Sequence, residues 1–383
     1  MRYTTAGESH GRALVAVVSD VPAGVRLDTA AVDLDLARRQ KGYGRGGRMA
    51  IETDRAMVLS GVRFGRTIGS PVAMTIGNRD AENWVDIMAT AGDPATAGRV
   101  TAPRPGHADL PGYLRNACDD VRDVLERASA RETAARVAAG AVAKAFLGQM
   151  GVRVSSFVTR IGSEALDVEP DAGNVDFAQV ESSDVSCPDE ETAARMRAAI
   201  DAARGAGESL GGVFVVAALG LVPGLGGYAQ ADQRLDARIG AAVLSVPAIK
   251  GVEFGDGFAA SARPGSTVHD PIMFEPGRGI VRPSNHAGGL EGGMTNGEPL
   301  VVRAAMKPIP TLMTALPSID LETMQPVDAA KERSDVCAVP AAAVVAEAEV
   351  AMVLATAYTD AFGDRCVDDI LSALEAYRSR LPR

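Results

Sequence analysis

The sequence predicts one large α+β domain. Helix-like and strand-like segments are mixed along its 383 residues without a regular βαβ order, and glycine-rich stretches connect them. No internal repeat and no low-complexity linker divides the chain, so we expect a single domain over residues 1–383. The 41 glycines and the single tryptophan indicate a fold in which close backbone approach matters more than aromatic stacking.

In the first half we expect a strand at residues 13–18, a hairpin or bent strands over 58–78, and one long helix over 119–150. Apolar residues recur at helical spacing in the last of these segments, and Gly151 would end it. Its many alanines favour a buried, central position. Arg127 and Arg131 lie four residues apart and would share one face of this helix.

The second half should alternate strands and helices. We expect strands at 152–162, 210–221 and 300–306, a loop over 164–190, and helices at 190–203, 231–244, 340–361 and 367–377. The glycine run over 285–297 is typical of a loop, either mobile or wrapped around a cofactor.

Charge and composition exclude several classes of protein. The net charge of -10 and the pI of about 5.1 argue against broad nucleic-acid binding, which needs an extended basic face. We expect no apolar run with the length of a membrane span, and no signal-peptide core follows Met1, so we expect a cytoplasmic protein. The four histidines lack the spacing of metal ligands.

The main exception to the acidic balance lies at residues 38–48, which hold five basic side chains and no acidic one. Arginine binds phosphate and carboxylate oxygens two at a time, and the glycines between the arginines allow backbone N–H groups to approach an anion. A basic surface loop is the ordinary alternative. We interpret the cluster as a site for a small ligand with several negative charges.

Two glycine patterns resemble the dinucleotide-binding fingerprint. Gly42, Gly44 and Gly47 fit its spacing, but a helical segment precedes them and an extended one follows, which is the wrong order. Gly224 and Gly226 with Ala229 follow a strand and precede a helix, but no clear βαβ unit continues from them. We therefore do not predict a dinucleotide fold.

Two of the four histidines lie in polar, glycine-flanked turns. His10 stands between glycines before the first strand, and His107 follows two prolines and Gly106. Such positions suit proton transfer, although a structural role is the commoner explanation of a single histidine. Lys307 ends a strand before a stiff proline turn, where it is well placed to bind phosphate.

Seven motifs occur in the order shown by chorismate synthases, and the chain resembles that family over residues 2–363. They are GESHG at 7–11, GYGRGGRM at 42–49, SGVR at 60–63, RPGHAD at 104–109, ERASARET at 126–133, EGGMTNG at 291–297 and RSD at 333–335. The resemblance implies a 1,4-elimination of phosphate from 5-enolpyruvylshikimate 3-phosphate to give chorismate, the last step of the shikimate pathway. It also implies reduced FMN as cofactor without net redox change, and a homotetramer whose subunits have helices between antiparallel sheets in a β-α-β sandwich.

The resemblance also assigns roles to residues. His10 would be the acid at the departing phosphate, His107 would protonate or polarise the reduced flavin, and Asp335 would act with flavin N5 in removing the ring proton. The substrate anions would be held by Arg39, Arg45, Arg48, Arg131 and Arg333. FMN would be bound by Arg127, Ala128, Ser129, Pro247, Ala248, Gly292, Lys307, Pro308, Ile309, Pro310, Thr311 and Arg333.

Arg39 and Arg45 are also the residues that NADPH would use, if the protein reduces its own flavin. Two positions depart from the family pattern, with His286 in place of an arginine and Pro310 in place of a serine. Losing the hydroxyl at 310 could weaken a contact to the flavin phosphate. A flavin or NADPH oxidoreductase is the alternative enzyme class, and a non-enzymatic polyanion-binding protein would leave the two histidines and Asp335 without a role.

Overall fold

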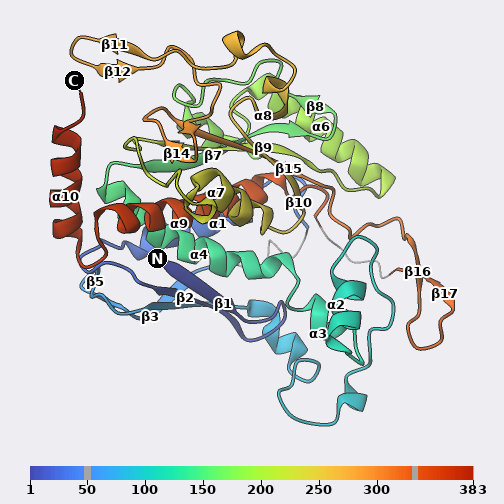
Figure 1. The fold of residues 1–383 in the computed structure, drawn as a ribbon. Coiled ribbons are helices and arrows are strands. Elements are labelled where there is room, and N and C mark those ends of the chain that lie inside the picture. The colour runs from blue at the N-terminus through green and yellow to red at the C-terminus, as the bar shows by residue number, and fades with distance from the viewer. Residues whose placement is uncertain (47–52, 330–334, 383) are drawn as a thin grey trace.

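Two antiparallel sheets enclose a layer of helices (Figure 1). The fold comes from a computed structural model, which describes residues 1–46, 53–329 and 335–382. The first sheet has the order β1-β2-β6-β3, with strands Arg2–Ala6, Ala13–Ser19, Val72–Gly77 and Ala56–Ser60. The second has the order β10-β15-β9-β7-β8, with strands Ile249–Phe254, Leu300–Met306, Gly212–Leu219, Arg153–Ile161 and Glu164–Ala165.

Helices α1 (Thr29–Gln40), α4 (Thr133–Gln149) and α9 (Val339–Phe362) fill the space between the sheets. Helix α4 packs on β1, β2 and β6, while α9 packs on β7 and β9 of the other sheet. The two helices also pack on each other, and α1 contacts both. The predicted α+β fold, with helices between antiparallel sheets, is confirmed.

The central helices approach closely because their sequences are rich in small residues. A Cβ atom on Gly140 of α4 would lie only 2.2 Å from the Cβ of Ala348 on α9, so no larger residue fits at this crossing. Helix α9 has the length and hydropathy of a membrane span, yet 89% of its most apolar window is buried inside the structure. The expectation that no apolar run has the length of a membrane span is therefore wrong for α9. Because the helix is buried between the sheets, it is a core helix.

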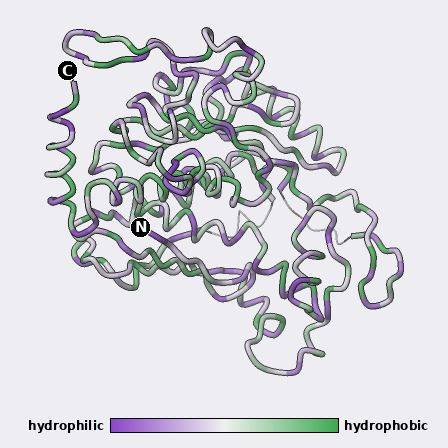
Figure 2. The backbone as a smooth tube through the Cα atoms, in the orientation of Figure 1, coloured by the Kyte–Doolittle hydropathy of each residue, from purple (hydrophilic) through white to green (hydrophobic). Residues whose placement is uncertain are grey.

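Of the remaining elements, α7 packs on α9 and on β10 of the second sheet, and the others lie around this sandwich. The helices are α2 (Asp109–Asn116), α3 (Arg122–Leu125), α5 (Phe177–Ser182), α6 (Glu190–Ala206), α7 (Leu235–Leu244), α8 (Gly257–Ala260) and α10 (Val367–Ser379). The two-stranded ribbons are β4–β5 (Val62–Arg63, Arg66–Thr67), β11–β12 (Met273–Glu275, Gly279–Val281), β13–β14 (Leu290–Glu291, Met294–Thr295) and β16–β17 (Pro317–Ile319, Pro326–Asp328). Hydrophobic and hydrophilic residues alternate along α10, as Figure 2 shows, and its buried residues lie three to four positions apart.

The predicted long helix over 119–150 is wrong in its first half. Ser129 has extended backbone angles, φ -65° and ψ 144°, and α4 begins only at Thr133. The Ser129 hydroxyl accepts a hydrogen bond from the N–H of Arg131 and caps a short 3-10 turn, η4 (Ala130–Glu132). Serine competes with helix hydrogen bonds in this way. Arg127 and Arg131 consequently do not share a helix face.

Two other predicted elements agree with the structure, and two predicted loops contain short elements. The strand at 300–306 is confirmed as β15, and the helix at 340–361 corresponds to α9. The stretch over 164–190, predicted as a loop, contains β8 and the short helix α5. The glycine run over 285–297 forms the ribbon β13–β14 at its centre.

Candidate active site

A cavity of about 680 Å³ opens at the N-terminal ends of α4 and α9. Its wall includes residues from the loop after β1, the segment after α1, the His107 turn, the segment after α7 and the end of β15. Its volume lies within the range of about 300–1,000 Å³ that is usual for small-molecule sites. The unpaired N–H groups at helix N-termini favour negatively charged ligands there.

Arg39, at the end of α1, is a buried cation in this wall, with only 4% of its surface exposed. Its Nε donates to Thr133 Oγ1 and its Nη2 to the carbonyl oxygen of Ala130, both at 2.8 Å. Within the described ranges, Nη1 is buried without a hydrogen-bond partner and lies 3.6 Å from Asp54. Burial, together with the neighbouring Arg45 and Arg131, lowers the pKa of Arg39 to about 9. The site therefore holds positive charge that the protein itself only partly compensates.

Arg131 lines the same cavity and anchors it to the first sheet. Its Nη1 donates to both carboxylate oxygens of Asp54 at 2.7 Å, and its Nε donates to Asn78 Oδ1 at 2.8 Å. The Asn78 amide in turn donates to the carbonyl oxygen of Gly11 at 2.7 Å. These contacts connect the arginine wall to the loop that carries His10.

His10 lies in the cavity wall with its ring held on two sides. Nδ1 lies 2.9 Å and 3.0 Å from the two carboxylate oxygens of Glu126, and the ring stacks on Trp84 with 3.8 Å between centroids. Ser9, which precedes it, is buried in the same wall and accepts a hydrogen bond from the Ser129 hydroxyl at 3.1 Å.

His107 also lines the cavity, and it is paired with a buried carboxylate. Its Nδ1 lies 2.5 Å from Asp109 Oδ1, and Arg104 donates to the same carboxylate through Nε and Nη2. Burial favours neutral Asp109, but the hydrogen bonds from His107 and Arg104 outweigh it and lower the pKa of Asp109 well below its usual range. Lys307 Nζ donates to the carbonyl oxygen of Gly106 at 2.9 Å, which ties this turn to the end of β15.

Asp335 is the third candidate for proton transfer, and it enters the cavity just before α9. Its Oδ2 lies 2.9 Å from Nη1 of Arg45, and its Oδ1 accepts from the N–H of Gly46 at 2.7 Å. The motif that contains Arg45 and the motif that contains Asp335, which are far apart in the sequence, therefore contact each other at this cavity.

Most of the predicted site residues line this one cavity. They are His10, Arg39, Arg45, His107, Ala128, Ser129, Arg131, Pro247, Ala248, Lys307, Ile309, Pro310, Thr311 and Asp335. Pro308 and Gly292 are not among its lining residues, and Gly292 lies in the turn of the β13–β14 ribbon. Arg48 and Arg333 lie outside the described residues.

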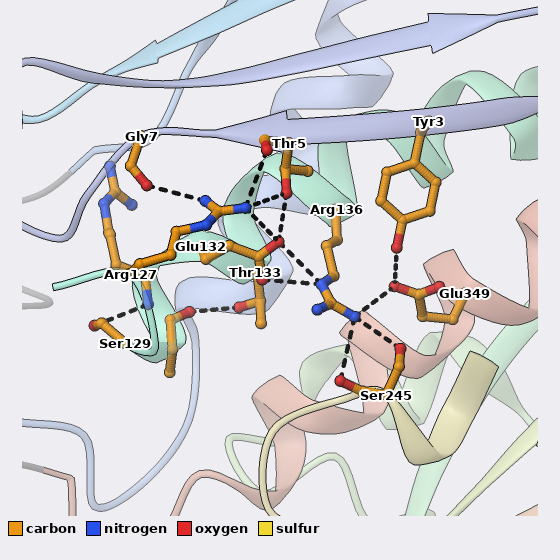
Figure 3. Close-up of polar contacts among 12 residues, drawn as sticks. Tyr3, Thr5, Gly7, Arg127, Ser129, Glu132, Thr133, Arg136, Ser245 and Glu349 are labelled. Atoms are coloured by element: carbon orange, nitrogen blue, oxygen red, sulfur yellow. Dashed lines mark hydrogen bonds and ion pairs between the residues drawn. The ribbon is translucent and has the colours of Figure 1, made fainter. Parts of the chain in front are cut away.

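Arg127 is also absent from the cavity lining. Its guanidinium donates to the carbonyl oxygen of Gly7 at 2.9 Å, and to the carbonyl and side-chain oxygens of Thr5 at 3.0 and 2.8 Å, as Figure 3 shows. In this structure it fixes the end of β1 against the turn that precedes α4.

Sequence reasoning did not single out Trp84, Glu126, Arg104 or Asp109 as site residues. Glu126, Arg104 and Asp109 lie within motifs quoted for the resemblance, and that position was the only signal for them. Trp84 belongs to none of those motifs. Its contact with His10 depends on the fold, which brings η2 (Arg79–Trp84) against the loop after β1.

This fold and cavity define the class of an enzyme that moves protons on a small polyanion. Cationic groups, two histidines that are each paired with a buried carboxylate, and a further carboxylate, Asp335, line one cavity. The sequence matches the chorismate synthase family over residues 1–359. It is 54% identical over 392 residues to the chorismate synthase of Symbiobacterium thermophilum, with full coverage of both chains. It is 55% identical to that of Rubrobacter xylanophilus, covering 99% of this chain and 97% of the relative.

A solved structure supports the same assignment. A crystal structure of chorismate synthase, 40% identical in sequence, superposes with a TM-score of 0.80 over 99% of this chain and 97% of the other. The chain belongs to the chorismate synthase family. It is a lyase of the shikimate pathway that converts 5-enolpyruvylshikimate 3-phosphate to chorismate, in the biosynthesis of aromatic amino acids.

Proposed function

We propose that this elimination takes place in the described cavity, with reduced FMN as cofactor and with His10, His107 and Asp335 as the groups that hold or move protons. The observation that carries the proposal is the convergence of these three residues, from three distant parts of the chain, on one arginine-lined wall. Preset charge of this kind is usually the largest single contribution to catalysis.

The cationic wall fits the substrate, which has one phosphate and two carboxylates. Arg39 and Arg45 would bind these anions directly, since Arg39 Nη1 is a buried donor without a hydrogen-bond partner among the described residues. Arg131 uses its guanidinium for Asp54 and Asn78, so its contribution would be positive charge and the support of its neighbours. Arg48 and Arg333, outside the described residues, stay predictions as further ligands.

The proton transfers follow from the positions of the three candidates. His10 would give a proton to the phosphate as it leaves with the electron pair of the broken C–O bond. Asp335 would accept the ring proton, and the electron pair of that C–H bond becomes part of the new double bond. His107 would hold a proton beside the bound cofactor.

FMN is compatible with the residues of this cavity. Val246, Pro247 and Ala248 line the cavity together with small apolar residues from the start of α9, and this apolar lining suits a planar ring system. Lys307 and Thr311 offer a cation and a hydroxyl for the cofactor phosphate, and Ala128, Ser129, Ile309 and Pro310 complete the set from the same wall. When bound, reduced FMN supplies electron density that eases cleavage of the allylic C–O bond without net oxidation.

The test is an anaerobic assay with photoreduced FMN and no NADPH. We expect phosphate and chorismate to appear in equal amounts while the flavin ends reduced, and His10→Ala to lower kcat by about 10²-fold or more. Failure of the folded, FMN-loaded protein to release phosphate would contradict the proposal. Unchanged turnover in His10→Ala would contradict the role of His10 alone.

A second arm of the same assay concerns the reductant. It uses oxidised FMN and NADPH in air, with Arg39 and Arg45 as the residues to vary. Chorismate formation there would show that the chain reduces its own flavin, whereas activity only with prereduced FMN would assign that step to a separate reductase.

We also propose a homotetramer in the cytoplasm. Large apolar side chains are exposed on the ribbons β4–β5 and β11–β12, among them Phe64 with 89% of its surface exposed and Phe274 with 59%. Such exposed apolar groups are typical of surfaces that associate. Sedimentation equilibrium measures the assembly, and a protein that stays monomeric at micromolar concentration would contradict the tetramer.

A further inference from the structure

Glu126 binds the His10 segment through both its backbone and its side chain. Its carbonyl oxygen accepts a hydrogen bond from the N–H of Ser9 at 2.9 Å, and its carboxylate accepts one from the N–H of His10 at 2.9 Å. The same carboxylate lies 2.9 and 3.0 Å from Nδ1 of the His10 ring. One residue thus fixes the main chain and the imidazole of a residue 116 positions away.

The Glu126 carboxylate is nearly inaccessible, with 2% of its side chain exposed against 17% for His10. Burial by itself would favour the neutral acid, but the hydrogen bonds from His10 outweigh it and lower the pKa of Glu126. Arg122 lies 3.7 Å from Oε1, which is too far for a strong hydrogen bond. His10 is therefore the principal partner of this buried charge among the described residues.

Trp84 restrains the ring from a different direction. Its indole stacks on the imidazole with 3.8 Å between centroids and 21° between planes, and its Nε1 donates to Asp80 at 3.0 Å. The carboxylate and the indole together leave the imidazole little freedom to rotate. Trp84 is also the single tryptophan of the chain, so its fluorescence reports on this contact.

We propose that Glu126 is a positioning residue for the elimination, which holds His10 with a proton on Nδ1 so that Nε2 is the nitrogen that serves the departing phosphate. The inference rests on the proposed role of His10. Because a carboxylate can only accept, the Nδ1 atom beside it must carry the proton in the neutral ring. The acid is the imidazolium form of His10, in which both ring nitrogens carry a proton. Nε2 gives its proton to the phosphate as the C–O bond breaks, and the neutral ring that remains has the Nδ1–H tautomer that Glu126 favours.

The pair at His107 differs in one respect that makes it a useful comparison. Asp109 also contacts Nδ1 of its histidine, but Arg104 donates three further hydrogen bonds to that carboxylate, two from its side chain and one from its backbone N–H. The charge of Asp109 is therefore balanced by the guanidinium of Arg104, whereas the main partner of the Glu126 carboxylate is His10. We therefore expect that any effect of Glu126 on catalysis depends strongly on the presence of His10.

The decisive variant is Glu126→Gln, because glutamine keeps the size of the side chain while its amide can donate to Nδ1. We expect kcat to fall by about 10²-fold with KM within about threefold, as when a histidine is held in the wrong tautomer. Asp123→Asn is the matched control, since Asp123 is an exposed carboxylate on α3, the short helix that ends just before Glu126. It should leave both constants unchanged.

A spectroscopic measurement separates tautomer control from simple support of the fold. Long-range ¹H–¹⁵N spectra of protein labelled in histidine, with the His10 signals assigned from His10→Asn, report which ring nitrogen carries the proton. We expect the Nδ1–H form in the neutral wild-type ring and the Nε2–H form in Glu126→Gln. An Nε2–H form in the wild type would overturn the inference. This outcome is measured on the wild-type protein, so it does not depend on whether Glu126→Gln folds.

A double-mutant cycle completes the test. If Glu126 acts through His10, then Glu126→Gln costs nothing further in the His10→Ala background. An additional tenfold loss there would show a different role for Glu126 and overturn the inference. If His10→Ala alone leaves kcat unchanged, the proposed role of His10 fails together with the catalytic part of the inference, while the NMR result still decides the tautomer separately.

Discussion

Glu347 and Glu349 lie two residues apart on α9, and their carboxylates meet opposite surroundings. Glu347 accepts hydrogen bonds from Arg38 at 2.6 and 2.8 Å, from Lys144 at 3.0 Å and from Ser156 at 2.7 Å. Burial alone would raise the pKa of Glu347, but the two cations lower it to about 2.

Glu349 faces the other side, where Tyr3 donates to it at 2.6 Å and Arg136 at 3.1 Å (Figure 3). Arg136 also donates to Glu132 and to Ser245, so its charge is shared. Here burial outweighs the hydrogen bonds from Tyr3 and Arg136, and the pKa of Glu349 is raised.

The first prediction concerns the stability of two matched variants. Glu347→Gln should lower the free energy of unfolding by about 3–5 kcal/mol, because it leaves two partly buried cations, Arg38 and Lys144, with Asp35 as their remaining carboxylate among the described residues. Glu349→Gln should cost less than about 1 kcal/mol, since the amide oxygen can still accept from Tyr3 and a costly buried charge is removed. Urea unfolding near neutral pH measures both. If both variants lose the same free energy of unfolding, then the interaction of Glu347 with Arg38 and Lys144 is not the main source of its stabilising effect.

The second prediction is the dependence of stability on pH. The folded pKa of Glu347 lies below its ordinary value of 4.5, so its contribution is present above about pH 4.5 and is lost as the pH falls toward about 2. Glu349 has a raised pKa, so it destabilises the fold increasingly as the pH rises above 4.5. Between about pH 2 and 4.5, Glu347→Gln should therefore show a flatter acid decline than wild type. If the free energy of unfolding of Glu347→Gln falls with pH as steeply as that of wild type, the lowered pKa of Glu347 is contradicted.

The third prediction separates ligand binding from stability at Arg39. Arg39→Met removes a buried, partly compensated cation, while Ala130 O keeps a hydrogen bond from Thr133 and Asp54 keeps Arg131. We expect no loss in the free energy of unfolding. The KM for substrate should rise by about 10- to 100-fold, because a hydrogen bond between charged groups is worth about 1.5–3 kcal/mol.

Thermal shift with substrate checks the Arg39 prediction independently of turnover. Substrate should raise the melting temperature of wild type, and of the exposed control Arg160→Met, more than that of Arg39→Met. A variant that is destabilised yet keeps its affinity would assign Arg39 to the fold instead of to the anion site.

Much of this organisation could be predicted from local sequence. Periodicity predicted β15 at its observed bounds, and the alanine content of the segment before Gly151 indicated a central helix. The break at Ser129 was missed, because helical spacing of apolar residues continues through it. There the serine cap and the contacts of Arg127 with Thr5 and Gly7 determine the backbone.

The partners of the site residues show the limit of sequence reasoning more clearly. His10 and His107 were recognised from their turns, and His107 has its carboxylate two residues away. The carboxylate for His10 comes from Glu126, and no periodicity connects positions so far apart. Such pairs depend on how the sheets and helices assemble, and only the fold reveals them.

The last prediction concerns Asp335, whose carboxylate contacts Arg45 and the N–H of Gly46. If Asp335 accepts the ring proton, Asp335→Asn should lower kcat by about 10²- to 10⁴-fold. Substrate affinity should stay the same or increase, because a negative charge that competes for Arg45 is removed from a site for anions. Anaerobic kinetics and calorimetric titration of substrate measure the two quantities. If affinity falls together with kcat, and Arg45→Gln has the same effect alone and combined with Asp335→Asn, then Asp335 positions Arg45 and the proton acceptor lies elsewhere.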